Sequence, residues 1–364
     1  MKKLGFGLMR LPMLGGEIDI GQVCRMCDRF LESGFNYFDT AYGYNQGASE
    51  AAVKKALTER HPRESFRLAT KLPAWAGAKT KAEAERMFHT SLERTGAGYF
   101  DRYLLHNLGG KRTQVFDDFG IWDFLAARKA EGLIRELGFS MHDTADALDA
   151  VLRAHPEMDF VQLQINYADW EDAEVQSRLC WETARRHGKP VIVMEPVKGG
   201  MLADPPASVR ECFRSLDPAA SPSSWAIRFA ASLEGVDIVL SGMSSMAQME
   251  DNISYMRDFR PLSQAELEAV ETARRLYEAV PLVPCTRCGY CREGCPEHIN
   301  IPGAIGLMNE VRRFENLEGP RHTYGFVMGG AKASDCIACG QCEAACPQKL
   351  PIVELMQKAA ATLE

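Results

Sequence analysis

The chain has 364 residues, which is more than one hydrophobic core usually organises, so one large and one small domain are expected. Hydrophobic residues make up 46% and charged residues 25%, the proportions of an ordinary globular protein. The net charge of −7 argues against a nucleic-acid or membrane-surface partner, and no apolar run of about eighteen residues is available to cross a bilayer.

The first residues of the chain are typical of a strand and not of a secretion signal. Two lysines open the sequence, but glycines and Arg10 interrupt the apolar stretch that follows them. A secretory signal needs a longer uninterrupted apolar region. We therefore expect the protein to act in the cytoplasm.

Short apolar runs recur through the first 240 residues, and helical patterns separate them. Runs such as VIVM are wholly apolar, as expected of strands buried on both faces of a parallel sheet. Eight strands alternating with helices predict an α/β fold, a (β/α)₈ TIM barrel. A doubly wound open sheet is the alternative, but no G-x-G-x-x-G turn follows the first strand. The runs are Leu4–Leu8, Phe35–Asp39, Arg67–Lys71, Arg102–His106, Arg135–Phe139, Val161–Ile165, Pro190–Met194 and Asp237–Ser241.

Polar residues stand at the ends of several of these runs. Active sites of barrels lie at the carboxyl ends of the strands or just beyond them. A charged side chain has little structural reason to end an apolar run, so these residues are candidates for function. They are Asp39, Lys71, His106, Ser140 and Asn166.

A helix is expected after the eighth strand. Ser263 and Glu266 form the S-x-x-E pattern of a capping box, so the helix should begin at Ser263 and continue to about Ala279. Pro281 and Pro284 then break the pattern. The expected domains are a barrel over residues 1–280 and a second domain over residues 281–364.

Eight of the twelve cysteines form two motifs of the type C-x₂-C-x₂-C-x₃-C-P, one at 285–296 and one at 336–347. This run is typical of proteins with two [4Fe–4S] clusters, in which three cysteines bind one cluster and the fourth binds the other. Zinc held by four cysteines is the alternative, but two complete runs closed by proline favour iron. The spacing assigns Cys285, Cys288, Cys291 and Cys346 to one cluster and Cys295, Cys336, Cys339 and Cys342 to the other.

The segments around the motifs are predicted to be helical. A helix is expected between the motifs (PGAIGLMNEVRRFENL) and another after the second motif (PIVELMQKAAATL). The tail therefore resembles the small, mainly α-helical two-cluster ferredoxin-like domain of many redox subunits. Cys24 and Cys27 lie outside it, in a probable amphipathic helix, and are expected to serve helix packing.

Three stretches of the barrel resemble the signature segments of the aldo-keto reductases. They are GFNYFDTAYGYNQGASE, FRLATKLP and FDRYLLHNL, and the resemblance extends along nearly all of residues 1–255. The cluster-bearing tail is similar to that of a subgroup of this family. The resemblance implies an NAD(P)-dependent oxidoreductase with a catalytic tetrad formed by Asp39, Tyr44, Lys71 and His106.

Carbonyl reduction gives this tetrad a chemical rationale. Hydride goes to the carbon and a proton to the oxygen, and a tyrosine whose ordinary pKa is about 10 must supply that proton. We expect the ammonium group of Lys71 to lower the pKa of Tyr44. Asp39 would keep Lys71 charged and oriented, and His106 would orient the carbonyl by a hydrogen bond.

The resemblance also implies a nicotinamide nucleotide in the barrel. Ser140 and Gln162 would hold the carboxamide, and Met194 takes the place of the aromatic ring that many members stack on the nicotinamide. Gly242 and Gln248 stand where basic residues usually bind the 2′-phosphate of NADP, so NADP and NAD both stay open. The expected contacts are Met9, Ser140, Gln162, Met194, Pro196, Gly242, Gln248, Asp251 and Asn252.

Two functions follow from these patterns. The tetrad predicts a carbonyl reductase or alcohol dehydrogenase acting on a small molecule. The clusters predict an electron-transfer protein with a redox partner, the barrel serving as a docking module. Hydride carries two electrons and a [4Fe–4S] cluster moves one at a time, so a flavin would be needed to join the two activities, and no flavin motif is present.

Overall fold

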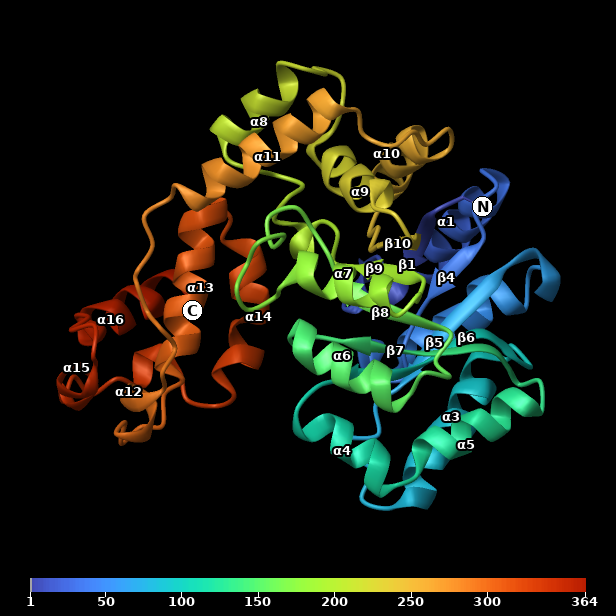
Figure 1. Cartoon of the computed structure of the whole chain (residues 1–364), viewed down its shortest axis with the longest axis horizontal. Coiled ribbons are helices and arrows are strands. Elements are labelled where there is room, and N and C mark those ends of the chain that lie inside the picture. Colours follow the sequence, from blue (N-terminus) through green and yellow to red (C-terminus); the bar gives the residue numbers. More distant parts are fainter. Residues whose placement is uncertain (1) are drawn as a thin grey trace. The chain divides into compact units, whose positions relative to one another are not determined.

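The computed structural model describes residues 2–364, and Figure 1 shows its parallel strands and surrounding helices. Within these residues eight parallel strands close into a barrel in the order β1, β10, β9, β8, β7, β6, β5, β4. The predicted (β/α)₈ barrel is therefore confirmed, because each predicted run overlaps one strand. The strands are β1 (Leu4–Gly7), β4 (Tyr37–Asp39), β5 (Arg67–Leu72), β6 (Phe100–Leu108), β7 (Ile134–Met141), β8 (Phe160–Gln164), β9 (Val191–Met194) and β10 (Val236–Ser241).

The strands are apolar because both of their faces are buried. The outward faces pack against the helices in one large core that includes Phe38, Leu68 and Val193. The inward faces fill the barrel itself, so the interior is packed and is not a pore. The interior side chains are Tyr37, Ala69, Leu104, Phe160, Ile192, Ile238 and Leu240, with Met194 packed against them.

Several barrel helices begin with a side-chain cap that satisfies a backbone N–H of the first turn. Asp19 Oδ1 accepts a hydrogen bond from Gln22 N at 2.9 Å at the start of α1. Cys24 and Cys27 lie in α1, where Cys27 is buried against the barrel, as expected of packing residues. The helices are α1 (Ile20–Glu32), α2 (Ala48–Val53), α3 (Lys81–Thr95), α4 (Lys111–Asp118), α5 (Ile121–Ala130), α6 (Ala145–Ala154), α7 (Ser177–Arg186), α9 (Pro222–Ser232) and α10 (Met246–Met256).

A short antiparallel hairpin of β2 (Met13–Leu14) and β3 (Glu17–Ile18) follows the first strand. The sequence analysis missed it, because two-residue strands leave no periodicity to detect. Gly15 and Gly16, both with positive φ, form the turn between them.

The described chain divides into two compact units. The first contains the chain up to Val197 together with Ser223–Leu267, and the second contains Lys198–Pro222 together with Glu268–Glu364. The expected domain boundary at residue 280 remains a prediction, because the two compact units do not test it. The capping box before α11 is present, since Ser263 N donates to Glu266 Oε2 at 2.8 Å and Glu266 N donates to Ser263 Oγ at 3.3 Å.

The second unit is mainly helical, as predicted for the tail. Its apolar core is built from Ile301, Ile305, Tyr324 and Met356, and buried cysteines form part of it. None of the helices in residues 2–364 is long and apolar enough to cross a membrane. The helices of this part of the chain are α8 (Ala207–Arg214), α11 (Gln264–Glu278), α12 (Tyr290–Glu293), α13 (Ile301–Phe314), α14 (Glu318–Met328), α15 (Gln341–Ala345) and α16 (Ile352–Leu363).

Candidate functional site

A buried ion pair lies at the carboxyl ends of β4 and β5. Lys71 is 1% exposed and Asp39 is 2% exposed, and Lys71 Nζ donates to Asp39 Oδ1. The same ammonium donates to Thr40 O at 2.7 Å. Burial is the largest single effect and opposes a charge on Lys71, but Asp39 and Tyr44 together outweigh it and raise the pKa of Lys71, so the lysine keeps its proton.

Tyr44 lies on a 3-10 turn (Tyr44–Gly47) just beyond β4. Its hydroxyl is 3.5 Å from Lys71 Nζ. We expected Lys71 to lower the pKa of this phenol, and the ammonium does act in that direction. Burial is the larger effect, however, so the pKa of Tyr44 lies above its ordinary value and the phenol is protonated at neutral pH.

His106, on β6, completes this group. Its ring meets the Tyr44 ring edge-on, with the ring centroids 5.8 Å apart. Burial and the nearby Lys71 charge lower the pKa of His106 to about 3, so the imidazole is neutral. Its Nδ1 is buried without a hydrogen-bond partner among the described residues. The structure thus brings Asp39, Tyr44, Lys71 and His106 together.

The residues expected at the nicotinamide carboxamide lie on neighbouring strands. The register of β7 and β8 pairs Ser140 with Gln162, and each is 1% exposed. Gln162 Oε1 is buried without a partner in the described chain. An unpaired buried acceptor costs stability unless a ligand satisfies it, and an amide N–H would do so. Met194 ends β9 beside the interior cluster.

Asn107 is a candidate that the sequence analysis missed. Its backbone N donates to Ser140 Oγ at 2.8 Å, and its side-chain Oδ1 is buried without a partner among the described residues. The backbone has φ of 59°, a conformation that asparagine tolerates better than most residues. Its place directly after His106 was the available signal. Asn166, in contrast, bonds internally, donating to Asp169 Oδ2 at 2.8 Å.

Several of the expected nucleotide contacts lie in the loop after β10 and on α10. Asn252 donates to Ser241 Oγ at 2.7 Å and accepts from the Tyr255 hydroxyl, so its amide is already engaged. Gln248 Oε1 accepts from Ser244 N at 2.7 Å. The other expected contacts are the exposed Gly242, the half-buried Asp251 on α10, the exposed Met9 before the hairpin, and the buried Pro196 after β9.

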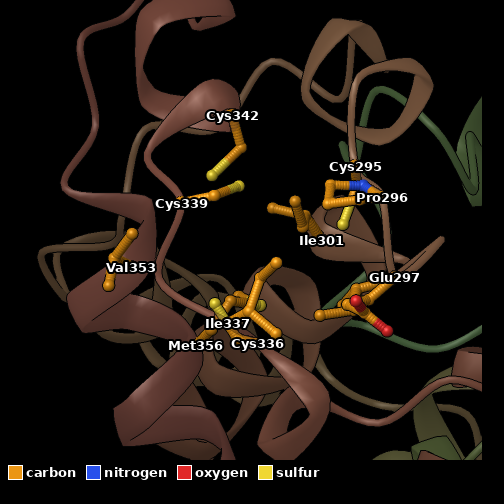
Figure 2. Close-up of a pocket in the computed structure, with 11 residues that line it drawn as sticks. Cys295, Pro296, Glu297, Ile301, Cys336, Ile337, Cys339, Cys342, Val353 and Met356 are labelled. Atoms are coloured by element: carbon orange, nitrogen blue, oxygen red, sulfur yellow. The ribbon is translucent and has the colours of Figure 1, made fainter.

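Two pockets in the second unit are each lined by four cysteines. The first cluster pocket is lined by Cys285, Cys288, Cys291 and Cys346. The second cluster pocket is lined by Cys295, Cys336, Cys339 and Cys342, and Figure 2 shows these side chains around one space. The two sets are those that the motif spacing assigns. Across residues 2–364 no three His, Cys, Asp or Glu side chains converge as for a single metal ion.

Comparison with known proteins identifies both parts of the chain. The aldo/keto reductase family model matches residues 3–275, and the 4Fe-4S dicluster domain model matches residues 284–350. An aldo-keto reductase of Mycolicibacterium smegmatis is 33% identical over 132 residues, which cover 35% of this chain and 44% of that protein. The match therefore spans less than half the length of that relative.

The other similar proteins support the same assignment. The NADH-specific methylglyoxal reductase of Escherichia coli is 29% identical over 226 residues, covering 56% of this chain and 65% of that protein. The holo form of aldo-keto reductase AKR11C1 from Bacillus halodurans has a TM-score of 0.57 at 25% identity, covering 74% of this chain and 91% of that chain.

A Klebsiella pneumoniae aldo-keto reductase solved with NADPH has a TM-score of 0.59. It is 20% identical and covers 74% of this chain and 90% of that chain, so the likeness shows the fold alone. The family model itself spans most of the chain. The chain is therefore an oxidoreductase that belongs to the aldo/keto reductase family and carries a C-terminal 4Fe-4S dicluster domain.

Proposed function

We propose that the barrel reduces a carbonyl to an alcohol, or runs the reverse oxidation, with Tyr44 as the general acid. The observation that carries the proposal is the position of Lys71 Nζ, which touches Asp39, Thr40 O and the Tyr44 hydroxyl at the carboxyl end of the barrel. A bound nicotinamide nucleotide would supply or take up the hydride.

The tyrosine is suited to donate a proton. It is protonated at neutral pH because burial raises its pKa, and a general acid must hold its proton until the oxygen of the substrate develops charge. The neighbouring Lys71 charge would stabilise the phenolate that remains after transfer. Asp39 would hold Lys71 in place through the buried ion pair.

The neutral imidazole of His106 suits a positioning contact and not proton donation at neutral pH. With a pKa of about 3, it offers one N–H to hydrogen-bond a carbonyl oxygen. Gln162 Oε1 and the Ser140 hydroxyl supply an acceptor and a donor that fit the two ends of a carboxamide. These groups would orient the nicotinamide against the substrate.

The nucleotide we propose is NADH in preference to NADPH. Gly242 and Gln248 provide no basic side chain for a 2′-phosphate, and phosphate binding usually relies on such groups. The E. coli relative is named NADH-specific, whereas the Klebsiella structure contains NADPH. Initial rates with each nucleotide at saturating carbonyl would test the preference.

Tyr44→Phe tests the chemical role. We expect kcat/KM for a small aldehyde to fall by about 10²–10⁴-fold, the usual contribution of general acid catalysis. Tyr42→Phe, two residues earlier in the same loop, is the matched control and should retain wild-type activity. Full activity of Tyr44→Phe on every carbonyl that the wild type reduces would refute the proposal.

A second activity is favoured by the cysteine-lined pockets. We propose that the eight cysteines hold two [4Fe–4S] clusters that exchange single electrons with a redox partner. Thiolate donors in two sets of four fit such clusters, and Cys288 and Cys339 are exposed at the surface of the unit. Anaerobically purified protein without reducible clusters would refute this second activity.

A further inference from the structure

The two cluster pockets are nearly equivalent in size. Their empty volumes, which include space open to solvent, are about 330 Å³ and about 340 Å³. The second cysteine of each motif is exposed, and the third cysteines, Cys291 and Cys342, are each 7% exposed. The fourth cysteines differ modestly, since Cys346 in the first pocket is buried and Cys295 in the second is half-buried. Burial therefore gives the first cluster no advantage in accepting an electron.

The charges beside the ligands do distinguish the two pockets. Arg287 lies between the first two cysteines of the first motif, and Arg292 directly follows Cys291. The equivalent positions of the second motif hold Ala338 and Glu343. Two matched positions next in sequence to the cysteines thus carry positive charge in the first motif, and neutral or negative groups in the second.

The crossover of the fourth cysteines increases this difference. Glu297 follows Cys295 and lines the second cluster pocket (Figure 2). Lys349 stands three residues after Cys346, and its backbone N donates to Cys346 O at 3.1 Å, which holds its backbone next to a ligand of the first cluster pocket. Asp335 directly precedes Cys336, the first cysteine of the second motif, and adds a further carboxylate next in sequence to a ligand of the second pocket.

The net result is a charge difference across one small unit. Close in sequence to the ligands of the first pocket stand three basic residues, offset by Glu293. Close in sequence to the ligands of the second stand three acidic residues, offset by Lys332, and of these Glu297 lines the pocket itself. Adding an electron to a cluster is favoured by nearby positive charge and opposed by nearby negative charge. The reduction potential of an iron–sulfur cluster responds to this local charge.

We propose that the two clusters have unequal reduction potentials, and that the cluster in the first pocket, beside Arg287, Arg292 and Lys349, is reduced first. The proposal rests on the ligand assignment given above. An electron delivered to either cluster would come to rest on the first, which makes the first cluster the electron store of the unit and the second cluster the stronger donor.

The test is a redox titration of the anaerobic full-length protein with dithionite, followed by electron paramagnetic resonance, after iron analysis. We expect iron for two clusters and two separate one-electron steps. Arg292→Glu should lower the potential of the higher step only, and Glu297→Arg should raise the potential of the lower step only. Both side chains are exposed, so both variants should fold. The double variant should bring the two steps together.

Two further variants serve as a second test of the charge effect and as a control. Glu343→Gln removes a charge at the second pocket but keeps the acceptor that Val353 N uses at 2.9 Å, so it should also raise the lower step. Arg275→Glu, on α11 away from the motifs, should shift neither step. A single unresolved step in the wild type, or Arg292→Glu acting on the lower step, would overturn the proposal. Iron for fewer than two clusters would refute the ligand assignment itself.

Discussion

The barrel site and the cluster pockets are built in different ways. In the barrel, protein groups hold each other in position: Lys71 is bonded to Asp39 and to Thr40 O before any ligand arrives. In the second unit, the cysteines belong to the apolar core, where Cys291, Cys342 and Cys346 pack beside Ile305 and Met356. Their thiols face pockets instead of protein partners.

This difference indicates which parts of the molecule depend on a cofactor. A site made of ion pairs and strand ends is stable without its nucleotide, because the barrel supplies its folding energy. A small unit whose core includes metal ligands gains folding energy from the metal itself. The barrel should therefore keep its structure when iron is lost, and the second unit should not.

Removal of iron should produce the largest effect. After anaerobic chelation, we expect backbone amides of α13 and α16 to lose most of their protection from hydrogen exchange, because the core around the cysteines opens. Amides of β5 and β6 should keep theirs. Equal loss in both regions, measured by mass spectrometry, would show that the units do not differ in this way.

Lys71→Met should separate stability from chemistry in the barrel. Removing one partner of a buried ion pair costs about 3–5 kcal/mol, because the Asp39 carboxyl would stay buried without the ammonium that stabilises it. Lys71→Met with Asp39→Asn should recover most of the free energy of unfolding, measured in urea. The carbonyl reductase activity of this double variant should remain about 10²–10⁴-fold below that of the wild type. Recovery of activity along with stability would contradict the role given to Lys71.

The half-buried His106 gives the barrel a pH dependence of stability. The pKa of His106 is about 3 in the folded protein and near its ordinary 6.5 when unfolded. The unfolded state therefore binds the proton first, and stability falls as pH drops from about 6.5 toward 3. When the pH is lowered from 7 to 5, the free energy of unfolding in urea should fall by about 2 kcal/mol less for His106→Gln than for the wild type. Equal losses would show that the pKa of His106 is not lowered in the folded protein.

The nucleotide end of the barrel should show the smallest effect. A Cβ at Gly242 would meet Arg10 at 3.8 Å, an ordinary contact, so Gly242→Arg should fold normally. The added guanidinium should raise kcat/KM for NADPH relative to NADH by about tenfold, equivalent to about 1.4 kcal/mol. Gly242→Gln is the uncharged control, and an equal gain with it would argue against a charge effect.

The sequence predicted much of this architecture because its signals are strong. Buried parallel strands are wholly apolar, so the positions of β9 and β10 follow from VIVM and DIVLSG. The cysteine spacing predicted both sets of pocket residues. The hairpin at Met13 and the burial that raises the pKa of Tyr44 were not predictable, because they depend on short local pairing and on tertiary packing.

The hydrogen bonds made by loop residues could not be predicted from the sequence either. Nothing in the residue pattern shows that Asn252 is already bonded to Ser241, or that Asn107 reaches Ser140. Such contacts join residues that are far apart in the chain and whose polar character is common on loops. The charge difference between the motifs, in contrast, can be read from the sequence. Assigning each charge to a pocket also requires knowing that the fourth cysteine of each motif lines the other pocket.

We propose that the barrel reduces its carbonyl substrate independently of the clusters. This claim is tested most directly by adding NADH to anaerobic, cluster-loaded protein, first alone and then with a small aldehyde, while recording the visible spectrum. We expect the cluster absorption to stay unchanged in both steps, and NADH to be consumed only once the aldehyde is present. Bleaching of the clusters by NADH alone would contradict the claim, because electrons would then pass from hydride to iron.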